Sequence, residues 1–405
     1  MKQDLDRLMS DRGLDALVVS GDALGNPSFV YMVNGASVGG GWVIQKRGEQ
    51  PVFVCSPIER EEAAASGLTV VPTSHFHYVE LTLEKASRLE VGVELYRRIF
   101  AELGVSGRVG FYGMADPGAA WLLLNALNEQ IDGIEVYGDY DQTPIDLARA
   151  TKDAAEAERI RQVGHRASAV LGETLEFLKS HGVKDGVLVQ ADGSPLTVGR
   201  VHRQIGRFFS EQRLEAPEGF IFSTGRDAGV PHNTGDPQAL IRQGETIIFD
   251  CYPCEAGAGY YFDITRTFCL GYAPPEVEAA YQDLLDCHDM LLAAFQVGTG
   301  TRHYQQLTCE FLESRGHPTI ASDPQTVVGY VHSLGHGIGL AVHEQPYFND
   351  GPANTTVLQP GHVFTCEPGL YYPDQGFGLR IEDVLWIDPQ GSVHNLSDFP
   401  RELVV

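Results

Sequence analysis

Four short segments in the second half of this 405-residue chain combine acidic and histidine side chains with strand-like patterns. The first is the apolar run 246–249, which ends in Asp250. The second is 262–268, in which Asp263 belongs to an alternating polar and apolar pattern. The glycine-containing stretch 255–259 between them predicts the turn of a hairpin. Two buried carboxylates that converge on paired strands repel each other unless a cation lies between them.

The other two segments add an imidazole and two further acids. Residues 332–344 form a glycine-rich histidine run, and its glycines favour a strand or loop over a helical histidine pair. The apolar runs 363–369 and 378–384 predict a second hairpin, which carries Glu367 and Glu382. The candidate metal ligands are Asp250, Asp263, His336, Glu367 and Glu382.

Four carboxylates and one imidazole provide mostly oxygen donors. Such a set suits two hard or borderline divalent ions better than a thiolate-bound zinc ion, and two such ions balance the charge of four carboxylates. Two metals about 3.5–4 Å apart can share a bridging hydroxide and clamp a carbonyl group, which is the arrangement of metal-dependent amide hydrolysis.

Taken together, these segments resemble the pita-bread-fold metallopeptidases, which include Xaa-Pro dipeptidase (prolidase), aminopeptidase P and methionine aminopeptidase. The resemblance rests on Asp250, the DITRT segment of Asp263, the GHGIGL…HE run, CEPG with Glu367, and RIED with Glu382. Residues 1–150 resemble the creatinase-type amino-terminal domain of the proline-directed members, so the resemblance covers the whole chain.

The resemblance implies a role for each metal ligand. Asp250 would bind one metal, Asp263 and Glu382 would bridge both metals, and His336 with Glu367 would complete the other site. Glu367 would also take and return the proton of the bridging water, because a general base must lie within hydrogen-bond reach of that water.

The resemblance also implies four further site residues. His232 and His343 match the substrate histidines, which contact the scissile carbonyl and stabilise the oxyanion. His332 resembles a third histidine of the pocket in the proline-directed enzymes. Arg380 lies two residues before Glu382 on the same strand face, from which it would steady the metal carboxylates.

Other reactive residue types have simpler interpretations. Seven scattered cysteines do not form the pattern of a disulfide framework, so we expect buried free thiols. Cys251 and Cys254 have C-x-x-C spacing, but no second Cys/His pair accompanies them, and a hairpin strand is the better interpretation. His202, His288 and His303 are predicted to be ordinary surface or core residues.

The elements that position these residues alternate between strands and helices, which indicates an α/β (α+β) fold. Strands are expected at 16–19, 41–44, 52–54 and 108–111, and helices at 94–103 and 119–127. The first domain is expected to end near residue 150, where Thr151 or Asp153 could cap a long helix over 154–180. Further helices are expected near 275–297 and 301–315. The resemblance therefore implies a creatinase-like amino-terminal α/β domain over 1–150 and a pita-bread catalytic domain over 151–405.

Composition limits the partners and the location. The chain has 29 Lys+Arg against 54 Asp+Glu, a formal net charge of −25, so nucleic acid and anionic membrane surfaces would repel it. The first residues lack the apolar core of a signal peptide, and no later run approaches the length of a membrane span. We therefore expect a cytoplasmic protein that binds neither nucleic acid nor membrane.

The function implied is that of a dinuclear metal-dependent exopeptidase that hydrolyses the bond at Xaa-Pro through a metal-bridging hydroxide. Proline lacks an N–H and has a fixed φ, so its peptides need a dedicated pocket. Xaa-Pro dipeptidase and Xaa-Pro aminopeptidase are the favoured activities, and the substrates are proline-containing dipeptides or short peptides. The cofactors would be two divalent ions, with Mn²⁺ favoured and Co²⁺ or Zn²⁺ as alternatives, and a homodimer is implied.

The sequence is also compatible with three alternatives. A proline-specific carboxypeptidase could use the same site, and a non-catalytic binding module could keep the same fold. A creatinase-like, metal-free hydrolase is disfavoured because the five ligands are present. Asp250 and Asp263 are 13 residues apart, more than is usual in the resembled family, so the turn beside the pocket is expected to be enlarged. This leaves the length and polarity of the substrate open.

Overall fold

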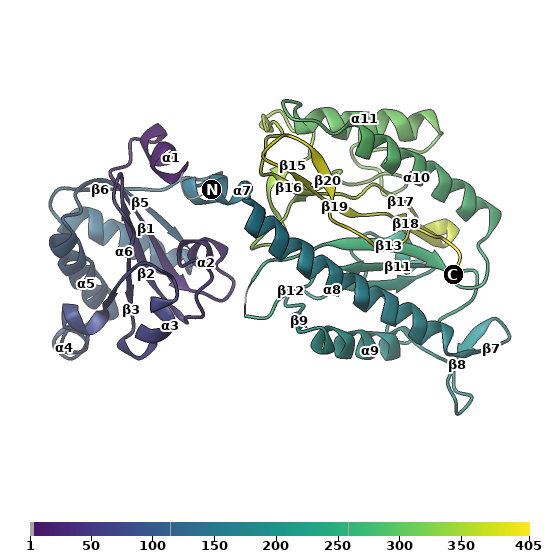
Figure 1. Cartoon of the computed structure of the whole chain (residues 1–405), viewed down its shortest axis with the longest axis horizontal. Helices are drawn as coiled ribbons and strands as arrows, with labels where there is room; N and C mark the ends of the chain where they lie inside the picture. Colours follow the sequence, from purple (N-terminus) through teal and green to yellow (C-terminus); the bar gives the residue numbers. More distant parts are fainter. Residues whose placement is uncertain (1–3, 114, 258) are drawn as a thin grey trace. The chain divides into compact units, whose positions relative to one another are not determined.

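The computed structural model describes residues 4–113, 115–257 and 259–405 (Figure 1). They divide into two compact units: the first contains the described residues up to Arg149 together with Gly257 and Gly259, and the second contains Ala150–Ala256 and Tyr260–Val405. Among the described residues, no helix combines the length and the apolar character needed to cross a bilayer. The expected mixed α/β fold is confirmed.

The first unit is built on a six-stranded mixed sheet with the order β4-β3-β2-β1-β5-β6. Its strands are β1 (Ala16–Asp22), β2 (Gly40–Lys46), β3 (Val52–Cys55), β4 (Thr69–Pro72), β5 (Gly107–Gly113) and β6 (Ile134–Tyr137). Strands β1, β2 and β3 are antiparallel neighbours, whereas β1 and β5, β3 and β4, and β5 and β6 are parallel pairs. Each predicted strand of this region is confirmed.

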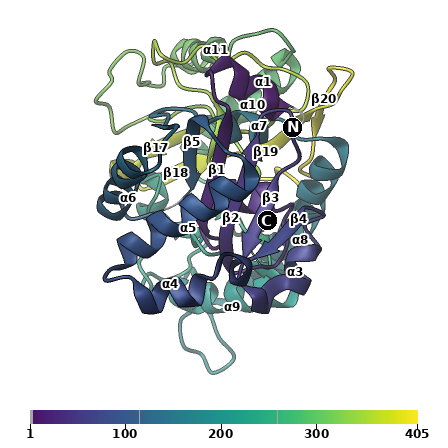
Figure 2. The ribbon, with the colours of Figure 1, turned by 90° about the vertical axis from the view of Figure 1, so that its left-hand side faces the viewer.

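Helices flank this sheet. They are α1 (Leu5–Asp11), α2 (Pro27–Met32), α3 (Arg60–Ala64), α4 (Tyr78–Glu84), α5 (Arg88–Leu103) and α6 (Pro117–Gln130), and α7 (Pro144–Ala150) follows. The Ser87 side chain accepts a hydrogen bond from the Glu90 amide and so caps α5. Helix α5 buries Ile99 in one hydrophobic cluster with Val18 and Val109 of the sheet. Figure 2 shows α5 in front of β1 and β2.

Four helices cover the strands of the second unit: α8 (Ala154–Lys179), α9 (Val198–Glu211), α10 (Pro275–Ala294) and α11 (Thr301–Ser314). Of the two caps proposed for α8, Asp153 is the one used, in a capping box with Glu156. Helices α8 and α9 share one hydrophobic core with β11 and β13, and α10 and α11 share another with β16 to β19. Figure 1 shows these two helix pairs on opposite sides of the strands.

The strands of this unit form several short sheets. The first half contains β7 (Gly182–Lys184), β8 (Val187–Val189), β9 (Leu214–Glu215), β10 (Ile221–Thr224), β11 (Thr246–Cys251), β12 (Cys254–Glu255) and β13 (Ile264–Cys269). The second half contains β14 (His336–Gly337), β15 (Glu344–Tyr347), β16 (Val363–Cys366), β17 (Gly369–Tyr372), β18 (Phe377–Arg380), β19 (Asp383–Ile387) and β20 (Val393–Asn395). The two largest sheets have the orders β10-β11-β13 and β15-β14-β16-β19-β20.

Both predicted hairpins are present, each with one difference. Strands β11 and β13 are antiparallel, but the connection between them contains β12, which pairs with β9, so it is more than a simple turn. The second hairpin is interrupted into the pairs β16–β19 and β17–β18. The pairing register is the same on both sides of this interruption, because Cys366 faces Asp383 and Gly369 faces Arg380. The interruption falls where Glu367 and Glu382 lie.

Candidate metal centre

Strand register brings the four candidate carboxylates together. Asp250 of β11 faces Thr265 of β13, and an isolated bridge pairs Thr265 with Glu382. Asp263 precedes Thr265 by two residues and is therefore the diagonal neighbour of Asp250 on the same face. The continuous register of the second hairpin places Glu367 opposite Glu382. The acids thus lie along one row that crosses both hairpins.

The fifth candidate ligand, His336, comes from β14. Its backbone N–H donates to Thr365 Oγ1 at 3.1 Å. The ring Nδ1 lies 3.1 Å from the Gly337 carbonyl, which can only accept, so Nδ1 carries the proton. The other nitrogen, Nε2, is consequently free to accept and lies 3.7 Å from Asp263 Oδ2 and 3.4 Å from Glu367 Oε1. This is the tautomer required of a metal-binding imidazole.

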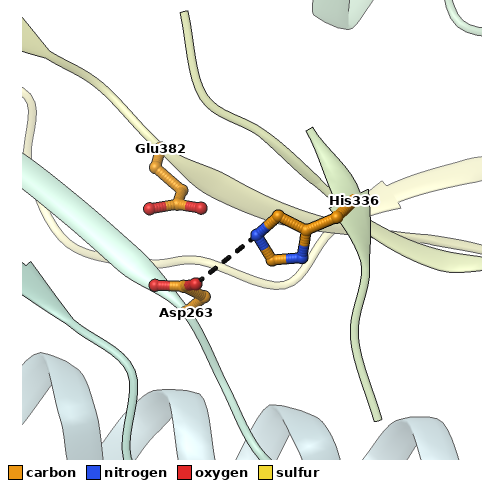
Figure 3. Close-up of side chains that lie close together, drawn as sticks. All are labelled: Asp263, His336 and Glu382. Carbon is orange, nitrogen blue, oxygen red and sulfur yellow. Dashed lines mark ion pairs between the residues drawn. The ribbon is translucent and has the colours of Figure 1, made fainter. Parts of the chain in front are cut away.

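Three of these side chains point toward a common centre. Ligand atoms of Asp263, His336 and Glu382 all lie within 4.8 Å of one another, and all three residues are buried. Figure 3 shows the two carboxylates and the imidazole approaching one another from three separate segments of the chain. The structure therefore joins residues that are far apart in sequence.

Burial and mutual repulsion make these carboxyl groups difficult to ionise. Burial raises the pKa of Asp263 well above its usual value, and the charges of Glu382 and Asp250 raise it further. Burial and Glu382 likewise raise the pKa of Glu367, and burial and Asp250 raise the pKa of Glu382 to about 8. Burial, followed by His343, lowers the pKa of His336 to about 3, so its imidazole is neutral. A cation would relieve this repulsion.

Buried carboxylate oxygens without a hydrogen-bond donor also favour a bound cation. Asp250 Oδ1, Asp263 Oδ1 and Glu382 Oε1 are buried, and no described residue donates a hydrogen bond to them. Buried carboxylate oxygens are costly without a partner. These three acids line one cavity with the neutral imidazole of His336, and together they form an oxygen-rich donor set, which fits divalent cations.

Arg380 holds two of the acids in place through a buried network. Its Nη2 donates to Asp250 Oδ2 at 2.5 Å, its Nη1 to the Tyr371 hydroxyl at 2.7 Å, and its Nε to Thr265 Oγ1 at 3.2 Å. Thr265 Oγ1 in turn donates to Glu382 Oε2 at 2.7 Å. Each of these acids therefore has one oxygen fixed by the protein and one oxygen left without a donor.

A cavity of about 500 Å³ opens onto this cluster. It is lined by the five candidate ligands, by Arg380, and by Glu218, Ile221, Pro231, His232, Thr234, Tyr252, His332, Ser333, Val342, His343 and Tyr347. All nine residues predicted for the site therefore lie on one cavity.

The three non-ligand histidines of the cavity differ in their contacts. The His343 ring stands edge-on to His336, with a centroid separation of 4.3 Å. His332 Nε2 lies 2.9 Å from the Tyr371 hydroxyl, and burial, followed by the charge of Arg380, lowers the pKa of His332 to about 4. His232 lies on the cavity wall.

The residues predicted to lie outside the site do so. His202 contacts the Phe222 carbonyl at 3.0 Å, His288 is fully buried, and His303 is exposed. All seven cysteines are buried free thiols, as expected. Cys251 ends β11 and Cys254 begins β12, which confirms the strand interpretation of this pair.

Three site residues escaped the sequence analysis. Thr265 belongs to the DITRT segment, and its alternation with Asp263 could have drawn attention to it. Tyr371 carries no sequence signal, because its hydroxyl reaches Arg380 and His332 only through strand pairing. Glu218 lies in the segment between β9 and β10, which sequence patterns left unassigned.

Comparison with known proteins places the chain in a family. The model of metallopeptidase family M24 matches residues 158–389, which are more than half of the chain. The chain belongs to metallopeptidase family M24. The match includes all five residues of the candidate metal centre, and the family resemblance inferred from the sequence is confirmed.

Individual members of the family and solved structures extend this comparison. The Xaa-Pro dipeptidase of Pyrococcus furiosus is 30% identical over 187 residues, which are 45% of this chain and 48% of that protein. The chain thus matches about half the length of such relatives. The structure of Xaa-Pro dipeptidase from Bacillus anthracis has a TM-score of 0.77 at 22% identity and covers 100% of this chain and 99% of its own. The X-Pro aminopeptidase of Thermotoga maritima has a TM-score of 0.75 at 20% identity, with 98% and 100% covered. At these identities the two structures establish the two-domain pita-bread fold alone.

Proposed function

We propose that this M24 protein is a metal-dependent exopeptidase that hydrolyses the peptide bond at Xaa-Pro. In this proposal Asp250, Asp263, His336, Glu367 and Glu382 hold two divalent cations, with Mn²⁺ favoured. The substrates are proline-containing dipeptides or short peptides. Support comes from the family match and from the names of relatives and structural neighbours, which include both Xaa-Pro dipeptidases and an X-Pro aminopeptidase.

One observation carries the proposal. Buried oxygens of Asp250, Asp263 and Glu382 have no donor among the described residues, and these acids line the same cavity as His336, whose Nε2 is unprotonated. Burial raises the pKa of Asp263 and Glu382, and repulsion from neighbouring carboxylates raises it further. A fold that only needed stability would pair these groups with its own donors.

The chemistry that two divalent ions supply at such a site is polarisation of a carbonyl group and activation of water. The residues of the chain have the remaining tasks. Glu367, whose side chain is 17% exposed at the cavity, takes a proton from the attacking water and returns it to the leaving nitrogen. His232 and His343 donate to the carbonyl oxygen as it gains charge.

Two further residues act on this machinery. Arg380 orients the Asp250 carboxylate through its bond to Oδ2. His332, tied to Tyr371, shapes the wall against which the substrate lies. We also infer that 1–150 and 151–405 are separate domains, that the protein is a cytoplasmic homodimer, and that neither nucleic acid nor membrane is a partner.

The test combines metal analysis with product identification. The purified protein is reconstituted with Mn²⁺, Co²⁺ or Zn²⁺, its metal content is measured by mass spectrometry, and products are identified from Xaa-Pro, Xaa-Pro-Yaa and peptides ending in Xaa-Pro. We expect two metals per chain and chelator-sensitive cleavage of Xaa-Pro bonds. Release of carboxyl-terminal proline would establish a carboxypeptidase instead. Two bound metals without cleavage would contradict the proposed substrate class. A protein that neither binds metal nor cleaves these peptides would instead favour a binding module.

A further inference from the structure

The cavity contains one acid that the metal centre does not use. Of its five carboxylates, four belong to the candidate ligands, and the fifth is Glu218. Glu218 is exposed to solvent, whereas Asp263, His336 and Glu382 are buried, so Glu218 marks the open end of the cavity. Among the described residues, none forms a salt bridge or a hydrogen bond with its carboxylate.

The surroundings of Glu218 show where its charge acts. Its electrostatic interactions reach His343 and Tyr252, both on the cavity wall, and also Cys254 and Tyr261 of the β12 region. His343 is one of the two residues proposed to contact the scissile carbonyl. Glu218 therefore lines the same cavity as His343, and its charge acts on that histidine.

The cavity offers no free positive charge to balance this acid. Arg380 is the only lysine or arginine among the described lining residues, and its guanidinium already donates to Asp250, Tyr371 and Thr265. Two divalent cations would offset the four ligand carboxylates and Arg380 is bonded to Asp250, so Glu218 has no ion-pair partner among the described lining residues. A substrate group placed there is favoured if it is cationic and disfavoured if it is anionic.

We propose that Glu218 is a specificity-determining residue that selects peptides with a lysine or arginine side chain at the residue before proline. This inference rests on the proposed Xaa-Pro activity and names its substrate class. The proline side chain carries no charge, and the terminal charges are the same in all peptides of one length, so selection by side-chain charge must act on another residue. Xaa is present in the substrates of both dipeptidases and aminopeptidases, whereas a residue after proline is present only in longer peptides. The flexible, unbranched stem of lysine lets its ammonium group extend from the cleaved bond toward the open end of the cavity.

The test compares substrates that differ only in side-chain charge. The kcat/KM values of peptides with lysine, its uncharged analogue norleucine, and glutamate at Xaa are measured in whichever peptide length the protein cleaves. We expect the lysine peptide to exceed the norleucine peptide by about fivefold, the upper range for an exposed ion pair, and the glutamate peptide to be poorest. Because all three peptides have the same α-ammonium group, the ratio isolates the side chain.

Substitutions then assign the preference to one residue. In Glu218→Gln we expect the lysine-to-norleucine ratio to fall to about one, and in Glu218→Lys we expect glutamate to become better than lysine. The matched control is Glu211→Gln, which removes an exposed acid at the end of α9 outside the cavity lining and should keep the wild-type ratio. An unchanged ratio in Glu218→Gln would overturn the assignment.

A binding measurement separates this inference from the proposed activity. Calorimetric titration of lysinamide and norleucinamide into Mn²⁺-loaded wild type and Glu218→Gln needs no turnover. Tighter binding of lysinamide by the wild type, lost in the variant, supports the role of Glu218 even if no proline peptide is cleaved. Equal affinity of the two amides for the wild type would refute it even if proline peptides are cleaved.

Discussion

Two neighbouring acids in one strand region have opposite environments. Glu382 and Asp383 are adjacent in the chain and are 1% and 2% exposed. Burial and the charge of Asp250 raise the pKa of Glu382 to about 8. Burial acts on Asp383 in the same direction, but the charges of Arg266 and His288 and the hydrogen bonds from Asn395 and Arg266 together outweigh burial and lower the pKa of Asp383 below its usual value.

The difference lies in the donors that surround each acid. Arg266 Nη2 donates to Asp383 Oδ1 at 2.7 Å, and Asn395 Nδ2 donates to Asp383 Oδ2 at 2.8 Å. His288 Nε2 is 3.7 Å from the same Oδ2. We call Arg266, His288, Asp383 and Asn395 the arginine cluster, and the five candidate ligands the metal cluster.

The contrast shows that this fold is able to neutralise a buried carboxylate with its own side chains and does so one residue away from the metal cluster. The metal cluster has only Arg380 to offset four carboxylates, and three of its buried oxygens have no donor among the described residues. The excess negative charge there is a property of a binding site rather than a requirement of the fold. Substitution of an acid should therefore reduce activity but not stability in the metal cluster, and should reduce stability in the arginine cluster.

The largest expected effect is the loss of activity in Asp263→Asn. The amide removes one anionic ligand from the metal cluster, so kcat/KM should fall by about a thousandfold or more, with loss of bound metal. Because the change also removes charge repulsion, the metal-free variant should unfold at no lower temperature than the metal-free wild type. Wild-type activity in a folded Asp263→Asn variant would contradict the assignment of this residue as a ligand.

The equivalent change in the arginine cluster should reduce stability. Asp383→Asn leaves the buried charge of Arg266 without its anionic partner, at an expected cost of about 3 kcal/mol in the free energy of unfolding. The measurement is chemical denaturation of metal-free protein, with Asp263→Asn as the comparison. Similar stability of the two variants would remove the distinction between the clusters.

Arg380→Lys tests the connection between charge and geometry in the metal cluster. Lysine keeps the positive charge but cannot donate simultaneously to Asp250, Tyr371 and Thr265. We expect kcat/KM to fall about 10- to 100-fold, together with weaker metal binding, which is the usual range for residues that orient metal ligands. Retention of both properties would show that charge alone is sufficient.

The smallest expected effect is a pH dependence of the arginine cluster. Burial, partly opposed by Asp383, lowers the pKa of His288 to about 4 from an unfolded value of about 6.5. The unfolded state then binds more protons than the folded state between these values, so stability is full above about pH 6.5 and is lost as the pH falls toward 4. By pH 5 the loss attributable to His288 should be about 2 kcal/mol.

His288→Gln isolates this contribution. The variant should lose less stability than the wild type between pH 7 and pH 5 when both are unfolded by urea without metal. The remaining loss includes His362, whose pKa burial lowers to about 3 in the same direction. Identical pH profiles of the two proteins would contradict this account of His288.

The sequence predicted the parts of the site that local patterns encode. Alternation around Asp263, the apolar run before Asp250 and the glycines around His336 identified the segments that line the cavity, and the family resemblance supplied the roles proposed for them. Secondary structure was also predictable over α8, where apolar periodicity and Asp153 mark the helix. These features depend on residues that are close together in the chain.

The remaining features depend on pairing between distant segments. Thr265 reaches Glu382 across a separation of 117 residues, and no local pattern encodes that bridge. The second hairpin is interrupted at Glu382, because Glu382 forms its bridge with Thr265 of β13 and not with Glu367. Glu218 enters the cavity wall from an irregular segment, so its role could not be found before the fold was known.

The central claim is that the metal cluster holds two divalent cations. Its most direct test is anomalous diffraction from crystals grown with Mn²⁺, collected for the wild type and for Asp263→Asn. We expect two anomalous peaks among Asp250, Asp263, His336, Glu367 and Glu382 in the wild type, and the loss of at least one of them in the variant. Fully ordered ligand side chains without any anomalous peak at saturating Mn²⁺, or peaks located only elsewhere, would contradict the account.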